Sequence, residues 1–236
     1  MRIDKNHWLL TNPIAHRGLW NEKMPENTIL AYENAIKHGF PIEIDLQKSC
    51  DGEIFVYHDD DLLRLTNVNA KICHKNKDYI KSLNILDTNE KIPTLTEVLK
   101  TVNGRVPLLI EIKNQPDKNI VKDTLKALKD YKGEYAIQSF NPLYLLQLKK
   151  LDKSVLRGVL GTKSNEPKGA IKKFIVSKMP LNFLIKPDFI SYRINDLPIK
   201  TKKVPIISWT ITDSLTKEKA ERLSKNFIFE NFIPKK

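Results

Sequence analysis

Cysteine and glycine are scarce in this chain, which has two cysteines and eight glycines among 236 residues. Cys50 and Cys73 are too few for a disulfide framework and lack the spacing of metal ligands. No glycine-rich nucleotide loop is present, which removes the commonest reason to expect a doubly wound sheet. No apolar run approaches the length of a membrane span, and the opening residues turn polar before a secretory signal could form. From these absences we expect a cytoplasmic protein.

Basic residues outnumber acidic ones, 40 against 28, for a net charge of +12. The excess is concentrated in residues 149–203, which hold fourteen Lys and Arg but four Asp and Glu. Within this segment, Ala170–Met179 places apolar side chains at helical spacing among lysines, as in a basic patch that touches an anionic membrane or a polyanion. An ordinary helix packed inward is the simpler interpretation of the same spacing. We find no nucleic-acid-binding motif, so we expect no nucleic-acid partner.

Short apolar runs alternate with helical stretches along the whole chain. Several runs stay apolar until their last residues, which is typical of strands in a buried parallel sheet. The alternation favours an α/β protein, either a (β/α)8 barrel of the TIM type or a doubly wound sheet, and the missing nucleotide loop removes the commonest reason to choose the second. We see no linker, so we expect a single domain over residues 1–236. Residues 60–92 are irregular and polar, and we predict that they form a small insertion after the third strand. The candidate strands are Ile14–His16, Ile42–Leu46, Ile54–His58, Leu108–Lys113, Tyr135–Ser139, Arg157–Leu160, Phe189–Tyr192 and Ile206–Ile211, with Phe227–Glu230 as a further candidate.

Acidic residues stand near the carboxyl ends of two predicted strands, the edge that carries the active site of a barrel. Glu43 and Asp45 are two residues apart and therefore face the same side of their strand, as Glu111 and Lys113 do on another. Three carboxylates from two strands offer hard oxygen ligands suited to Mg²⁺ or Ca²⁺. The alternative is that each acid pairs with a neighbouring lysine.

Two histidines and two cations accompany these acids at the strand ends. His16 and His58 can serve as general acid and general base, because imidazole titrates near neutrality. Arg17 and Lys113 can hold a phosphate, the arginine through its planar fork and the lysine as a point charge. The remaining histidines lack such neighbours, and we expect structural roles for His7, His38 and His74.

These residues belong to an ordered set of motifs that resembles the glycerophosphodiester phosphodiesterase family of PLC-like phosphodiesterase barrels. The set covers residues 14–211, and its order is far more specific than any single motif. The matching segments are Ile14–Gly18, Pro25–Thr28, Ile42–Asp45, Asp51–Gly52, His58–Asp59, then Leu62, Arg64 and Thr66, followed by Ile92–Leu99, Ile110–Lys113, Gln138–Phe140 and Trp209–Thr210.

The resemblance implies a TIM barrel that hydrolyses small-molecule glycerophosphodiesters to glycerol 3-phosphate and an alcohol, with one divalent cation as cofactor. It also implies a role for each site residue. Trp209 looks like the aromatic residue that packs on the glycerol side of the pocket, although a core tryptophan is the alternative. The implied site residues are His16 and His58 for acid–base catalysis, Glu43, Asp45 and Glu111 for the cation, and Arg17, Lys113 and Trp209 for the substrate.

The end of the chain departs from the family pattern. Members usually close with a Gly-Ile-Ile-Thr-Asp-x-Pro-like segment, whereas residues 227–234 read Phe-Ile-Phe-Glu-Asn-Phe-Ile-Pro. Lysophospholipase D or phosphodiester lyase activity on the same barrel is the nearest alternative function. The cysteine pairs of secreted venom-type relatives are missing, which counts against that branch. A non-catalytic barrel that binds phosphodiesters is a further alternative. The presence of both histidines and all three carboxylates counts against it.

Overall fold

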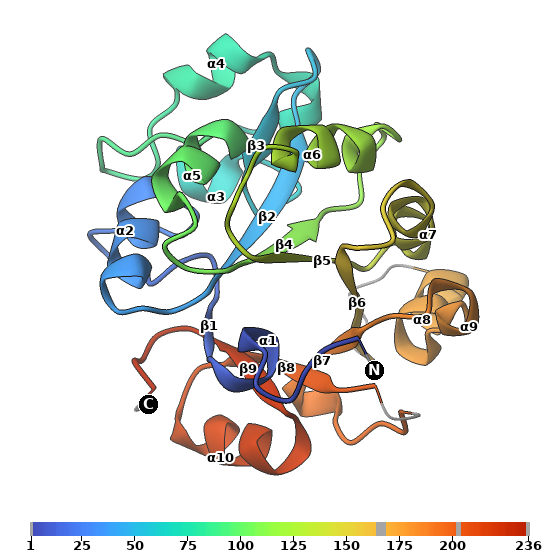
Figure 1. Cartoon of the computed structure of the whole chain (residues 1–236). Coiled ribbons are helices and arrows are strands. Elements are labelled where there is room, and N and C mark those ends of the chain that lie inside the picture. The colour runs from blue at the N-terminus through green and yellow to red at the C-terminus, as the bar shows by residue number, and fades with distance from the viewer. Residues whose placement is uncertain (1, 164–168, 202–203, 235–236) are drawn as a thin grey trace. The chain divides into compact units, whose positions relative to one another are not determined.

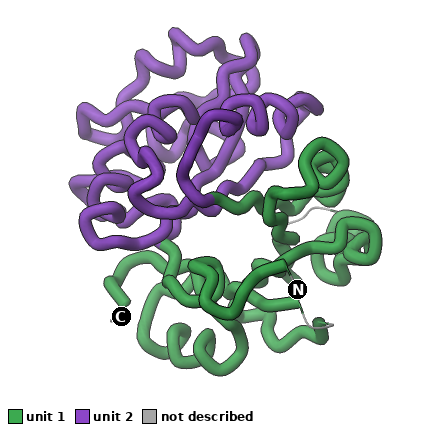
Figure 2. The backbone as a smooth tube through the Cα atoms, viewed as in Figure 1, with its two compact units in different colours: residues 1–14, 135–236 green, residues 15–134 purple. Residues whose placement is uncertain are grey.

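The fold is given by a computed structural model, which describes residues 2–163, 169–201 and 204–234. Strands alternate with helices along the chain (Figure 1). The chain divides into two compact units, residues 15–134 and residues 1–14 with 135–236 (Figure 2). A single domain over residues 1–236 stays a prediction.

In the unit of residues 15–134, strand β2 is the centre of the sheet. It pairs with parallel β1 at its start, with antiparallel β3 at its end and with parallel β4 along its other edge. Every residue of β2 is buried, and Ile42, Ile44 and Leu46 alternate with polar side chains, so that one face is apolar and the other polar. The elements are β1 (Ile14–Ala15), α2 (Ile29–Lys37), β2 (Ile42–Lys48), β3 (Ile54–Val56), α3 (Leu63–Thr66), η1 (Ile72–His74), α4 (Lys77–Ser82), α5 (Leu95–Val102), β4 (Leu108–Ile112) and α6 (Ile120–Leu128).

The run Ile54–His58 differs from the barrel strand that the sequence predicts. Only Ile54–Val56 forms a strand, and this β3 is antiparallel to β2. The insertion that follows it is more ordered than its polar composition indicates. Side chains of α3, η1 and α4 pack with a side chain of β3 in one hydrophobic cluster, which we call the cluster beneath β3. The buried members of this cluster are Phe55, Tyr57, Leu62, Leu65, Ile72, Ile80, Ile85 and Ile92.

In the other unit, five strands from β5 to β9 pair in sequence order, all parallel. The segment Phe227–Glu230, which the sequence offers as a further candidate, lies mostly in β9, so it is one of the parallel strands. Asn226 holds this strand to the N-terminal residues, since its side chain donates to the carbonyls of Leu9 and Asn12 at 3.0 and 2.7 Å. The elements are α1 (Trp8–Thr11), β5 (Tyr135–Ser139), α7 (Pro142–Leu151), β6 (Leu156–Gly161), α8 (Ala170–Lys178), α9 (Asn182–Ile185), β7 (Phe189–Arg193), η2 (Ile194–Asp196), β8 (Ile206–Ile211), α10 (Ser214–Leu223) and β9 (Asn226–Phe229).

The parallel strands are therefore β1, β2 and β4 to β9, in alternation with helices. This confirms the predicted TIM-type α/β fold, with β3 as an additional strand. None of the helices in the described part of the chain combines the length and the apolar character that crossing a bilayer requires.

Candidate active site

The three carboxylates predicted to bind a metal meet on neighbouring strands. Glu43 and Asp45 project from β2, and Asp45 stands opposite Glu111 of β4 in the parallel register. One ligand oxygen from each acid lies within 4.8 Å of the other two, and all three side chains are buried. The arrangement supplies the hard oxygen donors that Mg²⁺ or Ca²⁺ takes.

The electrostatics of this cluster favour a bound cation. Burial, followed by the charges of Asp45 and Glu111, raises the pKa of Glu43 well above its usual value. Burial also acts to raise the pKa of Asp45, but the surrounding cations, led by Lys113, outweigh it and lower that pKa. Asp45 Oδ1 is buried and accepts no hydrogen bond from any residue that the structure describes. A divalent cation would offset the repulsion and satisfy this oxygen, so the three acids fit such an ion.

Two positive side chains approach different oxygens of Asp45. Arg17 Nε lies 3.7 Å from Oδ2, and Lys113 Nζ lies 3.6 Å from Oδ1. Lys113 Nζ is also 3.0 Å from Glu111 Oε1. Burial acts to lower the pKa of Lys113, but the charges of Glu111 and Asp45 outweigh it, so the pKa is raised. Both side chains therefore stay charged at neutral pH, as ligands of a phosphate must.

The turn after β1 explains why a glycine stands two residues after His16. Arg17 and Gly18 have positive φ angles of 58° and 87°. A Cβ on Gly18 would lie 3.0 Å from atoms of Ala31, so glycine is required there. The Arg17 N–H donates to Glu43 Oε2 at 3.2 Å, and His16 Nε2 lies 4.0 Å from the same oxygen. The turn thus places His16 beside the carboxylate cluster.

His58 is positioned by contacts between β2 and the segment that follows β3. The Tyr57 N–H donates to the Asp45 carbonyl at 2.9 Å. The Gln47 side chain donates to the carbonyls of Tyr57 and Asp59 at 3.0 and 2.7 Å. His58 Nδ1 lies 2.8 Å from Asp59 Oδ1. If Nδ1 donates to this carboxylate, Nε2 is left available for proton transfer.

Glu26 and Arg64 connect the surroundings of the two histidines, and the sequence analysis gives neither a role. Arg64 Nε donates to Asp59 Oδ2 at 2.6 Å, and its terminal nitrogens donate to Glu26 at 2.7 and 2.8 Å. Glu26 Oε1 also accepts from Arg17 Nη1 at 2.7 Å. A continuous chain of ion pairs therefore runs from Arg17 to the partner of His58. Glu26 and Arg64 both lie in motifs that carry the family resemblance. Their place in those motifs was the sequence feature that could have indicated a role at the site.

Asn27 is a second contributor that the sequence analysis passes over. Its Nδ2 donates to Asp45 Oδ2 at 3.1 Å, while its Oδ1 accepts from the Tyr32 hydroxyl at 2.9 Å. Asn27 itself has a positive φ of 54°, and its N–H donates to the Arg17 carbonyl at 2.9 Å. It therefore orients the Asp45 carboxylate and ties the start of α2 to the His16 turn.

Trp209, the predicted substrate aromatic, lies in the other compact unit on β8. Its ring meets Phe140 edge-on, with centroids 5.9 Å apart and an interplanar angle of 86°. Its indole Nε1 is buried and forms no hydrogen bond within the described ranges of the chain. The role of Trp209 in substrate binding stays a prediction.

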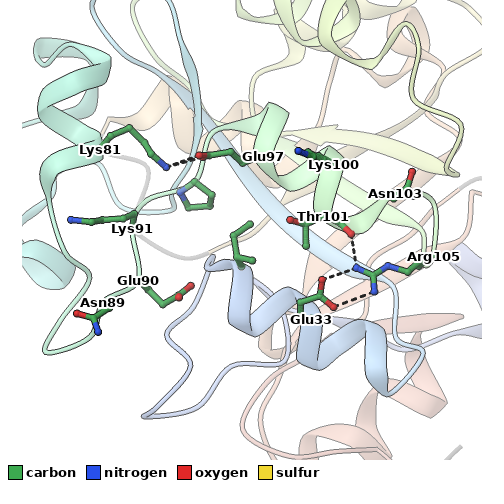
Figure 3. A pocket seen from close by; sticks show the side chains of 12 residues that line it. Glu33, Lys81, Asn89, Glu90, Lys91, Glu97, Lys100, Thr101, Asn103 and Arg105 are labelled. Atoms are coloured by element: carbon green, nitrogen blue, oxygen red, sulfur yellow. Dashed lines mark hydrogen bonds and ion pairs between the residues drawn. The ribbon is translucent and has the colours of Figure 1, made fainter.

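A separate open pocket of about 680 Å³ lies between α2, α5 and the segment before α5 (Figure 3). Four of its charged side chains form two pairs: Arg105 holds Glu33 at 2.7 and 3.2 Å, and Lys81 holds Glu97 at 2.9 and 2.8 Å. None of the predicted site residues lines it. The carboxylate cluster therefore remains the candidate site, and we give this pocket no ligand.

A family model described as the glycerophosphoryl diester phosphodiesterase family matches residues 16–233. The chain belongs to this family. A glycerophosphodiester phosphodiesterase of Caldanaerobacter subterraneus subsp. tengcongensis is 32% identical, over 90% of this chain and 89% of that protein. The family predicted from the motifs is thereby confirmed.

Solved structures of other proteins share the fold. A glycerophosphodiester phosphodiesterase from Thermotoga maritima is 26% identical with a TM-score of 0.71, and the match covers 92% of both chains. A phosphodiesterase from Oleispira antarctica, solved in complex with the product sn-glycerol-3-phosphate, is 22% identical with a TM-score of 0.78. That match covers 94% of this chain and 93% of the other. The predicted TIM-type fold thus agrees with structures solved for other proteins of this kind.

Proposed function

We propose that the chain hydrolyses glycerophosphodiesters to glycerol 3-phosphate and an alcohol, with a divalent cation and the His16/His58 pair. The observation that carries the proposal is the meeting of three buried carboxylates with Arg17 and Lys113 in the unit that also holds both histidines. The names of the relatives support the same activity, and the Oleispira antarctica phosphodiesterase binds glycerol 3-phosphate as its product. We further propose that the chain acts as a single domain in the cytoplasm.

The carboxylates of Glu43, Asp45 and Glu111 would hold the cation, Mg²⁺ or Ca²⁺. When bound, it would supply positive charge that polarises a phosphoryl oxygen. The chain adds its own charge, because the guanidinium of Arg17 and the ammonium of Lys113 lie beside the same acids. These two groups bind the phosphate and stabilise charge on its equatorial oxygens in the transition state.

Proton transfer falls to the two histidines. One imidazole accepts a proton from the nucleophile, and the other donates a proton to the departing alkoxide. The nucleophile is either water or the glycerol 2-hydroxyl of the substrate. Attack by the 2-hydroxyl expels the alcohol and gives a cyclic phosphate, which water then opens to glycerol 3-phosphate. Asp59 holds the Nδ1 side of His58, so we assign proton transfer at this residue to Nε2. Trp209 would pack on the glycerol side of the substrate.

The test is a cation-dependent assay on a panel of glycerophosphodiesters that measures glycerol 3-phosphate release. We expect activity with Mg²⁺ or Ca²⁺, loss of activity in EDTA, and weakened cation dependence in Glu43→Gln. Full activity in EDTA would refute the carboxylate site. A preference for lysophosphatidylcholine would instead identify a lysophospholipase D. A cyclic phosphate as the final product, detected by mass spectrometry, would identify a lyase.

A further inference from the structure

Large apolar side chains are exposed on the α8–α9 hairpin. Ile171 and Phe174 are 78% and 56% exposed on α8, and Phe183 on α9 is 71% exposed, with Leu184 beside it at 44%. Ile171 and Phe174 are three residues apart and so share one side of the helix. Four large apolar side chains exposed on two short helices that follow one another in the chain are more than the scattered exposure of single hydrophobics that folded proteins normally show.

The hairpin is held in place by other side chains, so these residues are not left outside by poor packing. Val176 is the buried residue of α8, and Ile185 is the buried residue of α9. Ile185 belongs to a cluster with Leu145 of α7 and Val159 of β6, against which Met179, Leu181 and Leu146 also pack. The Tyr192 hydroxyl donates to the Ser177 carbonyl at 3.2 Å. The helix that the sequence analysis expects to pack inward therefore does so on one side only.

Positive charge surrounds the exposed apolar residues. No acidic residue occurs between Glu166 and Asp188, whereas Lys172, Lys178 and Lys186 are exposed there. Lys149 of α7 reaches the hairpin, since its Nζ donates to the Leu184 carbonyl at 2.5 Å. Burial, followed by neighbouring positive charges led by Lys186, lowers the pKa of Lys149. Lys149 and Lys186 are therefore close enough to repel one another, and the repulsion is relieved when they meet negative charge.

We propose that the hairpin face formed by Ile171, Phe174, Phe183 and Leu184, with the lysines around it, docks on an anionic lipid surface. Apolar side chains enter the interface between headgroups and acyl chains, while lysines keep their ammonium groups at the level of the headgroup phosphates. The charge pattern favours a lipid surface over a protein partner, because lysines are depleted from protein–protein interfaces. The face lies within one compact unit, and residues 164–168 of the basic segment lie outside the described residues.

Vesicle flotation tests the proposal with the whole chain. We expect binding to phosphatidylcholine vesicles that contain about 30% phosphatidylglycerol, much weaker binding to pure phosphatidylcholine, and release at high salt. Phe174→Ser with Phe183→Ser should weaken binding about tenfold. The control is Leu215→Ser on α10, where a large apolar side chain that is 78% exposed lies outside the face. Lys172→Gln with Lys178→Gln should also weaken binding, roughly tenfold or more, whereas Lys122→Gln with Lys126→Gln on α6 should leave it unchanged.

Turnover of a soluble glycerophosphodiester serves as the check on folding and should be equal in all four variants and the wild type. Vesicle binding and turnover are measured separately. A failure of the docking proposal can therefore be distinguished from a failure of the proposed enzymatic function. The proposal is overturned if the wild type does not bind anionic vesicles, which leaves the face to a protein partner. It is equally overturned if neutral vesicles bind as well as anionic ones, or if the phenylalanine variant binds like the wild type.

Discussion

At the scale of single residues, the site depends on charges that hold one another in place. Arg17 contacts Asp45 on one side and Glu26 on the other, and Glu26 is shared with Arg64. Arg64 in turn holds Asp59, the partner of His58. A substitution in this chain of contacts should therefore act on catalysis even where the residue touches no substrate.

The two histidines carry the first prediction. His16→Ala and His58→Ala should each lower kcat about 100-fold or more, which is the usual scale of general acid–base catalysis. Glycerol 3-phosphate release at saturating cation is the measurement. His38→Ala is the control, because His38 caps α2 and its Nδ1 lies 2.8 Å from the Asn34 carbonyl. Near-normal turnover in either site variant would remove that histidine from the mechanism.

Arg64 is expected to position Asp59 rather than to meet the substrate. Arg64→Gln removes the fork between Asp59 and Glu26 and should lower kcat roughly tenfold, with a smaller change in KM. It should also alter the pH profile of kcat, since Asp59 faces His58. Arg105→Gln is matched to it, because Arg105 forms a similar two-pronged pair with Glu33 beside the open pocket (Figure 3). Equal kcat losses in the two variants would contradict a positioning role.

Asp59 gives a pH dependence whose sign follows from its contacts. Burial acts to raise its pKa, but hydrogen bonds from His58 and Arg64 outweigh burial and hold the pKa below its usual value. The stabilisation is therefore present above the unfolded-state pKa of about 3.9 and is lost as the pH falls toward the folded-state pKa. The difference in Tm between wild type and Asp59→Asn should shrink as the pH is lowered from about 6 to about 3. A difference that stays constant would show that the carboxylate is not stabilised by these contacts.

At the scale of elements, the sequence predicts the parallel strands well and the surroundings of His58 poorly. Glu43, Asp45 and Glu111 interrupt otherwise apolar strands, and this alternation is visible without a structure. The direction of β3 is set by pairing with β2, a long-range contact that local pattern does not encode. In the same way, the ion pairs of Arg64 join residues 5 and 38 positions apart, so spacing alone could not place them.

The insertion after β3 carries a prediction of its own. Ile80 is fully buried in the cluster beneath β3, so Ile80→Ala should lower the free energy of unfolding by about 2 to 5 kcal/mol. Leu63→Ala in the same insertion is the control, since Leu63 is half exposed and should change stability by less than about 0.5 kcal/mol. Urea unfolding followed by circular dichroism measures both. Equal effects would mean that the cluster does not support the insertion.

At the scale of the whole molecule, the departure at the C-terminus is accommodated by packing rather than by loss of the fold. Residues 226–229 form a fully buried parallel strand, and Phe229 meets Phe232 with ring centroids 5.7 Å apart. The small and threonine residues of the family pattern are absent from this segment. The departure therefore lies in one compact unit, whereas the carboxylates, both histidines, Arg17 and Lys113 lie in the other.

The carboxylate cluster should make the stability of the molecule depend on the cation. Three buried acids repel one another without it, and an ion that binds only the folded chain stabilises that chain by mass action. At a concentration near 100 times Kd, the gain is about 2.7 kcal/mol, which for a chain of this size raises Tm by about 5 to 10 °C. Differential scanning fluorimetry with Mg²⁺, Ca²⁺ or EDTA measures it. Glu43→Gln should abolish most of the shift, whereas Glu218→Gln on the surface of α10 should preserve it. A shift of the same size in Glu43→Gln would place the cation elsewhere, and it would do so without reference to turnover.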